Sequence, residues 1–251
     1  MQHIKELYYD EPISYKDLII FPVRMKDYLE FHYAVNCLLV EKNNIPDIKI
    51  ISMSYLRALY YLAVNQNQPY LYMARMLFCL VLRKPLDTEI KFYVDNNDKA
   101  FFEVEGVKYS ADDFDEIAKI IMEQNSIKPI DYTVQKEIRD ELEKAKKYRE
   151  RINKNKMCSL EDQMICVLIS TSLKLEDIYE LTIRKFEKIL SRVDAKLHYQ
   201  IYKQASMSGF VEFKDENAIA HWMSDLENKD PYKEEKVDME DLSNKIDNIN
   251  R

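Results

Sequence analysis

The chain has 251 residues, 47% of them hydrophobic, and carries a formal net charge of −7 at pH 7. The length suits one large domain or two small ones, and the apolar content is enough for a core, which excludes a globally disordered chain. Only two glycines occur, Gly106 and Gly209, which excludes the glycine-rich phosphate loops of most nucleotide-binding folds, while the acidic balance disfavours DNA or an anionic membrane as the main partner.

The first predicted elements are an extended segment and a helix. Residues 13–23 have an extended pattern that Pro22 ends. Apolar side chains at helical spacing predict a helix over residues 25–41. Residues 48–51 then fit a short strand.

Two more helices are predicted before residue 85. Ser52 or Ser54 is expected to cap the first, while Pro69 opens the second and Pro85 stops it. The apolar stretch 71–82 within the second is shorter than the roughly 18–20 residues that span a bilayer, so it is predicted to be a buried helix.

The middle of the chain changes to a β pattern. Short apolar runs at 90–94, 100–104 and 107–109, separated by turn residues, predict an antiparallel meander over about residues 90–109. Ser110 then fits the N-cap of a helix whose first turn is acidic, as the positive helix start favours.

The C-terminal half is predicted to be helical. A long charged helix is expected over residues 133–155, and Ser159 begins a nearly all-apolar helix through Ile169 that should be buried on all sides. Thr182 caps the helix with the most regular apolar spacing, and Gly209 is expected to end it.

Together these elements predict a mainly α fold, a multi-helix bundle with a small antiparallel β meander. We expect an N-terminal helical lobe over residues 1–156, including the meander and the charged helix, and a C-terminal helical lobe over residues 157–224. Residues 225–251 are charged, with interspersed apolar residues, and are expected to form a flexible tail that is able to fold on a partner.

No constellation of residues indicates catalysis, a cofactor or a metal. The acidic run 112–116 lies in a predicted first helical turn, where the helix dipole favours carboxylates whatever the function. The four histidines are scattered, and none has the spacing that places two nitrogens on one metal. We therefore expect no enzymatic activity, no cofactor and no metal site.

The cysteines and the start of the chain bear on the compartment. Cys37, Cys79, Cys158 and Cys166 occur singly within apolar stretches, which favours reduced core thiols over disulfides or metal ligands. The first residues lack the apolar stretch of a secretory signal. A cytoplasmic protein is expected.

Basic side chains are concentrated between Lys144 and Lys156. This run could bind phosphates, with Tyr148 available to stack on a base. A solvated helix whose cationic end complements the helix dipole explains the run more simply. Docking against an acidic protein, or against the chain's own tail, is a third interpretation.

Short motifs in several parts of the chain carry a resemblance to a known family. They are Ile20-Phe-Pro-Val23 with Met25-Lys-Asp-Tyr28 and Phe31, then Asp177-Ile-Tyr-Glu-Leu-Thr-Ile-Arg-Lys-Phe186 continuing through Arg192-Val-Asp194 and Tyr199-Gln-Ile-Tyr202 to Ser208-Gly209, and finally Val211-Glu-Phe-Lys214 with His221-Trp222-Met223. These segments resemble the tail assembly chaperones encoded in the tail modules of phages that infect Gram-positive bacteria.

The resemblance implies a non-enzymatic helper in the host cytoplasm. Such helpers coat the helical tape measure protein before the tail tube polymerises, are absent from the finished particle, and in some cases are extended by translational frameshift. The implied partner is the tape measure or another tail protein, with self-association as a further option and with no membrane. The candidate partner-binding residues are Arg184, Phe186, Arg192, Tyr202, Trp222 and Met223.

Three other functions stay open at this point. One is a structural virion component, such as a tail terminator, connector or baseplate part. Another is a nucleic-acid-binding regulator that uses residues 144–156, which the acidic balance disfavours. The third is an enzyme with a dispersed site, which would require a pocket that unites His198 or His221 with acidic residues.

Overall fold

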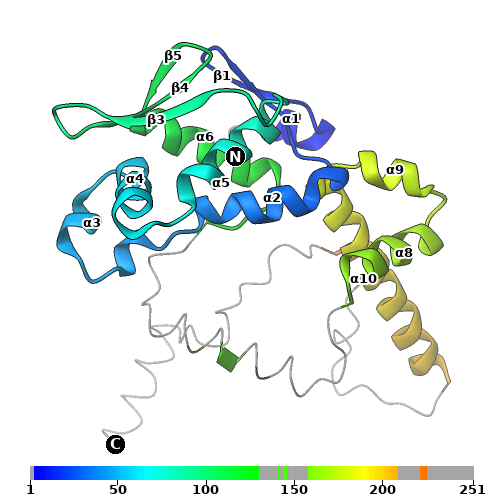
Figure 1. Cartoon of the computed structure of the whole chain (residues 1–251). Helices are drawn as coiled ribbons and strands as arrows, with labels where there is room; N and C mark the ends of the chain where they lie inside the picture. The colour runs from blue at the N-terminus through cyan, green and yellow to red at the C-terminus, as the bar shows by residue number, and fades with distance from the viewer. Residues whose placement is uncertain are drawn as a thin grey trace, which may run out of the picture. The chain divides into compact units, whose positions relative to one another are not determined.

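The computed structural model of the chain describes residues 3–129, 158–208 and 221–224, together with the isolated positions 141, 144, 145 and 148 (Figure 1). The chain forms two compact units, one of residues 1–190 and a second of residues 191–251. The predicted lobe boundary at residues 156–157 and the predicted tail over residues 225–251 lie outside the described residues.

The described residues form a mainly α fold with two small antiparallel sheets, which confirms the predicted class. Along the chain the described elements are α1 (Ile4–Tyr9), β1 (Ile13–Tyr15), β2 (Leu18–Ile20), η1 (Met25–Asp27), α2 (Tyr28–Ala34), η2 (Val35–Leu38), η3 (Lys42–Asn44), α3 (Ile48–Ser52), α4 (Tyr55–Gln66), α5 (Tyr70–Val81), β3 (Ile90–Val94), β4 (Ala100–Val104), β5 (Val107–Ser110), α6 (Ala111–Gln124), α8 (Leu160–Ser170), α9 (Leu175–Glu180) and α10 (Ile183–Met207).

The predicted meander is confirmed and runs one residue further than expected, to Ser110. Strands β3, β4 and β5 pair in sequence order, with Phe102 opposite Tyr109. The turn between β4 and β5 needs positive φ at both central residues, Glu105 at 50° and Gly106 at 84°, which is the geometry that favours glycine in a two-residue hairpin.

The core of the first unit lies beneath this sheet, against α5 and α6 (Figure 1). Phe78 of α5 lies with its ring centre 4.9 Å from that of Phe102 and 5.7 Å from that of Phe114 on α6. All three side chains are fully buried. Aromatic pairs at these separations contribute beyond the area they bury, so this cluster joins sheet and helices into one core.

The segment 13–23 forms a hairpin, β1 and β2, around a turn at Lys16, whose φ is 50°. The extended prediction is therefore correct but missed the reversal of direction. Two side chains at the end of α6 bind the backbone from the end of β2 to Val23. Gln124 Nε2 donates to the carbonyl of Ile20 at 3.1 Å, and Asn125 Oδ1 accepts from the amide of Val23 at 2.9 Å.

Two predictions in the next region need correction. The helix expected over residues 25–41 is broken into η1, α2 and η2 and ends at Leu38. The strand expected over residues 48–51 is helix α3. The side chain of Asp47 accepts a hydrogen bond from the amide of Lys49 at 2.9 Å, and this cap favours a helical turn over an extended conformation.

The starts of α4, α5 and α6 are as predicted. Ser54, not Ser52, caps α4, because its hydroxyl accepts from the amide of Arg57. Pro69 precedes α5, which ends at Val81, shortly before Pro85. At α6, Ser110 and Asp113 form a reciprocal capping box. Within the described residues, no helix has both the length and the apolar content needed to cross a bilayer.

The C-terminal helices add to the core of the first unit. Val167 of α8, Ile178 of α9 and both Ile183 and Phe186 of α10 are buried in it. The Thr182 hydroxyl accepts from the amide of Lys185 at 3.2 Å, which confirms the predicted cap. Gly209, and nearly all of the helix expected over residues 133–155, lie outside the described residues.

The cysteine prediction is only half correct. All four thiols are free, but Cys37 and Cys79 are buried whereas Cys158 and Cys166 are exposed. Burial raises the pKa of Cys37 to about 12, so this thiol stays protonated. Cys158 lies just before the N-cap of α8 and Cys166 lies within that helix, where the apolar sequence indicated a core position.

Candidate functional site

The C-terminal part of α10 exposes an apolar stripe. Helical spacing places Leu197 and Ile201 on the face that carries Ile183 and Phe186 at the start of the helix. Ile183 and Phe186 are buried in the core of the first unit, whereas Leu197 is 51% exposed and Ile201 59% exposed. The same periodic pattern therefore serves the core in the first turns of the helix and faces solvent in the later ones.

Within the second unit, the short segment 221–224 packs against a different face of α10. Arg192 donates from Nη1 to the carbonyl oxygens of Trp222 at 2.8 Å and Ser224 at 2.7 Å. The His221 ring lies edge-on to Tyr199 with ring centres 4.9 Å apart. Arg192 and Tyr199 lie on the side of the helix opposite to Leu197, so the apolar stripe is not the surface that receives this segment.

The predicted partner-binding residues fall into separate environments. Phe186 is buried, and Arg184 is hydrogen-bonded to the carbonyl of Leu7, so both have structural contacts in the first unit. Arg192 holds the backbone of Trp222 in the second unit. Tyr202 and Met223 are exposed, Tyr202 stacking on His198, and Trp222 is half-buried. Their role in partner binding stays a prediction.

Helix α8 also exposes apolar side chains, against the expectation that it is buried on all sides. Val167 is its one fully buried residue. Ile165 and Ile169, four residues apart on one face, are 47% and 74% exposed. The high apolar content of a helix therefore did not indicate how many of its faces are covered.

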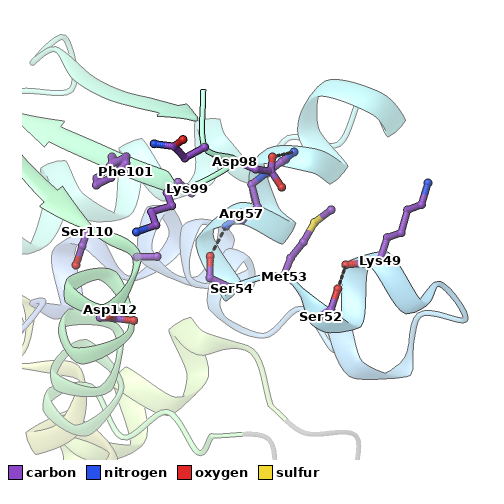
Figure 2. Close-up of a pocket in the computed structure, with 13 residues that line it drawn as sticks. Lys49, Ser52, Met53, Ser54, Arg57, Asp98, Lys99, Phe101, Ser110 and Asp112 are labelled. Atoms are coloured by element: carbon purple, nitrogen blue, oxygen red, sulfur yellow. Dashed lines mark hydrogen bonds and ion pairs between the residues drawn. The ribbon is translucent and has the colours of Figure 1, made fainter. Parts of the chain in front are cut away.

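A hollow of about 740 Å³ lies between the α3–α4 connection, the β3–β4 turn and the start of α6 (Figure 2). This volume is within the range of small-molecule sites. Arg57 is engaged in an ion pair with Asp98 at 2.7 Å, and the side chain of Lys49 points away from the other lining residues in Figure 2. Lys99 and Asp112 are the remaining charged groups of the lining. The hollow can hold a polar molecule, and neither histidine nor cysteine is among its lining residues.

One residue of the acidic run 112–116 at the start of α6, Asp113, has a structural role. Asp113 is buried and accepts hydrogen bonds from the Tyr15 hydroxyl at 2.7 Å and the Ser110 amide at 2.9 Å, with Lys16 Nζ at 2.6 Å. Burial raises the pKa of Asp113, but the bonds to Lys16, Ser110 and Tyr15 outweigh burial and lower it to about 2. The carboxylate therefore stays ionised and ties the hairpin to α6.

The described histidines do not converge. His198 lies 3.3 Å from Asp194 on the same helix, and His221 packs on Tyr199. Among the described residues, no three His, Cys, Asp or Glu side chains are grouped as metal ligands. A further cluster, which sequence reasoning missed, contains four basic residues around a small cavity at the end of α5 and beside η1.

Comparison with known proteins gives one likeness. Residues 152–227 match the family model of the YomV second domain, which covers α8, α9, α10 and the segment 221–224. The match spans less than half of the chain, and it points to a protein of phage type. No curated protein and no solved structure matches the chain.

Proposed function

We propose that the protein is a non-enzymatic phage protein that works by binding another polypeptide, as a tail assembly chaperone for the helical tape measure protein in the host cytoplasm. The observation that carries the proposal is the exposed stripe of α10, where Leu197 and Ile201 present apolar side chains one helical turn apart. Helices recognise one another through anchors with this spacing.

The energetics fit a weak contact that is repeated. Full burial of one large aliphatic side chain is worth about 1.5–3 kcal/mol, and association costs at least about 4 kcal/mol of lost freedom. Two such anchors therefore give a modest affinity by themselves. A long helical client offers many equivalent stretches, so that copies bound side by side can protect it and still be displaced during assembly.

Two further observations support the proposal. The stripe lies within the region that is similar to the YomV second domain, and this similarity points to a phage protein. Helix α8, in the same region, carries a second exposed apolar pair in Ile165 and Ile169. Each exposed apolar pair offers a separate contact to a protein partner.

Co-expression with the tape measure protein tests the proposal. The wild-type chain should co-purify with the client and increase its soluble fraction, whereas the double variant L197D/I201D should lose both effects. The matched control is K196D/K203D, which alters two exposed positions away from the stripe and changes the net charge more strongly. A client that stays insoluble with the wild-type chain, or equal capture by L197D/I201D, would contradict the proposal.

Mass spectrometry of purified phage particles provides a second test. An assembly chaperone leaves before the particle is complete, so its peptides should be missing from virions although they are abundant in infected cells. Stoichiometric amounts of the chain in virions would assign it instead to the structural components of the tail.

A further inference from the structure

A small cavity lies between the segment that follows β2 and the end of α5, within the first unit. Its volume is about 280 Å³, and its charged lining residues are Arg24, Lys26, Arg83, Lys84 and Asp27. Four cations against one carboxylate in so small a space repel one another unless other anions are close. The balance of charge around the cavity therefore decides what it can bind.

Backbone hydrogen bonds bring together the two segments that carry these cations. The amide of Phe21 donates to the carbonyl of Val81 at 2.7 Å, which holds the segment after β2 against the end of α5. Helix α5 closes with the amide of Lys84 bonded to the carbonyl of Cys79 at 2.9 Å and with Arg83 in the left-handed region, φ 51°. The Arg83 guanidinium carbon lies 4.1 Å from the centre of the Phe21 ring.

The surrounding carboxylates do not balance these cations. Glu180 of α9 forms ion pairs with both Arg24 and Lys26 and lies 2.8 Å from Lys26 Nζ. Glu105 forms an ion pair with Lys84 at 2.7 Å. With Asp27 this makes three carboxylates for four cations among the residues that the structure describes. In the described part of the chain, Arg83 has no carboxylate within ion-pair distance.

The surroundings of Arg83 lower the pKa of its guanidinium. Burial lowers its pKa, and the nearby Arg24 lowers it further, while Glu180 and Asp27 act in the opposite direction. Arg83 is an exposed residue, so its guanidinium is accessible to a binding partner. A planar oxyanion that accepts two parallel hydrogen bonds matches a guanidinium best. Arg24 and Arg83 both line the cavity, so an anion bound in it would reduce the repulsion between them.

We propose that this cavity binds a carboxylate side chain of an acidic polypeptide, with Arg83 and Arg24 as its principal contacts. The inference deepens the proposed function and rests on it in taking a polypeptide as the partner. Two observations favour a carboxylate. Glu180 already places a carboxylate on Arg24 and Lys26, and a single unmatched positive charge fits a single negative one.

Fluorescence anisotropy with a labelled glutamate-rich peptide tests this site. We expect wild-type protein to bind it, R83Q to bind about tenfold more weakly, and a peptide with glutamine in place of glutamate not to bind. E180Q should bind more tightly than wild type, because it frees Arg24 and Lys26 from their internal counterion. The control K91Q makes the same charge change as R83Q at an exposed lysine on β3 and should leave affinity unaltered.

Several results would overturn the inference. Equal affinity of wild type and R83Q, or weaker binding by E180Q, would do so. So would tighter binding of a single-stranded oligonucleotide that R83Q abolishes, because it assigns the site to phosphate. If R83Q does not fold, E180Q carries the test, since Glu180 is 51% exposed. The stripe variant L197D/I201D should bind the peptide as wild type does, because its two substitutions lie outside the cavity. If wild-type protein binds the peptide but does not capture the client, that result counts against the proposed function alone.

Discussion

Replacement of Asp113 by asparagine should destabilise the protein at neutral pH and have little effect in acid. In the folded protein the pKa of Asp113 is lowered to about 2, from 3.8, because the bonds to Lys16, Ser110 and Tyr15 outweigh the effect of burial. The side chain is only 9% exposed, so solvent screens these contacts little. A difference of this size between folded and unfolded pKa corresponds to about 2 kcal/mol of stability.

The sign follows from the lowered pKa. Folding favours the ionised carboxylate, so the stabilisation is complete above the unfolded pKa near 4 and is lost as the pH falls through 4 towards 2. Urea unfolding followed by circular dichroism should show wild type about 2 kcal/mol more stable than D113N at pH 7. The two free energies of unfolding should converge between pH 4 and pH 2.

Two neighbours provide controls for this prediction. Lys16 is 53% exposed, so K16M should cost less, about 0–1 kcal/mol. The bond to Asp113, then burial, raises the pKa of Tyr15 to about 12, so the stability that Tyr15 contributes should be lost as the pH rises from 10 to 12, and Y15F should remove that loss. A D113N deficit that is equal at pH 7 and pH 2, or no deficit at pH 7, would refute the reasoning.

The remaining predictions concern stability and thiol reactivity. N125A should lower the free energy of unfolding by about 1–3 kcal/mol, because it leaves the buried amide of Val23 without its acceptor, and urea denaturation measures this change. F102A should cost about 3–5 kcal/mol in the same assay, since it opens the aromatic core, and a cost below about 1 kcal/mol would contradict the packing of these rings. In native protein, Cys158 and Cys166 should react with a thiol reagent within minutes, whereas Cys37 should react only after unfolding; rapid labelling of Cys37 would show that its burial is wrong.

The parts of the fold that sequence predicted well have local causes. The meander follows from alternating apolar residues and from the turn at Glu105-Gly106, and α6 follows from the Ser110 capping box directly after it. Each of these signals lies within a few residues of the element that it specifies. Tertiary contacts then agree with the local preference, so pattern and structure coincide.

The failures occur where a short pattern is ambiguous. Residues 48–51, Ile-Lys-Ile-Ile, are too few to show a period, and such a short run fits a strand or a helical turn equally well. The capping bond from Asp47 selects the helix. The apolar residues of α8 predicted the helix correctly. They did not predict its exposure, because composition does not show which face another element covers.

The candidate sites were the least predictable features. The spacing of Leu197 and Ile201 predicted a helix, but only the structure shows that the stripe loses its cover after the first turns of α10. Arg24 and Arg83 come from segments far apart in sequence, and they share a cavity because the end of α5 is bonded to the segment after β2. No local sequence motif predicts that these two arginines line the same cavity.

Isothermal titration calorimetry should detect binding of the protein to a purified helical segment of the tape measure protein. The titration is repeated at several temperatures to obtain the change in heat capacity. Binding through the apolar stripe should give a negative change in heat capacity, because apolar surface leaves water on association. L197D/I201D should abolish the signal and K196D/K203D should preserve it. The absence of binding by the wild-type protein, or binding with no change in heat capacity, would contradict the account.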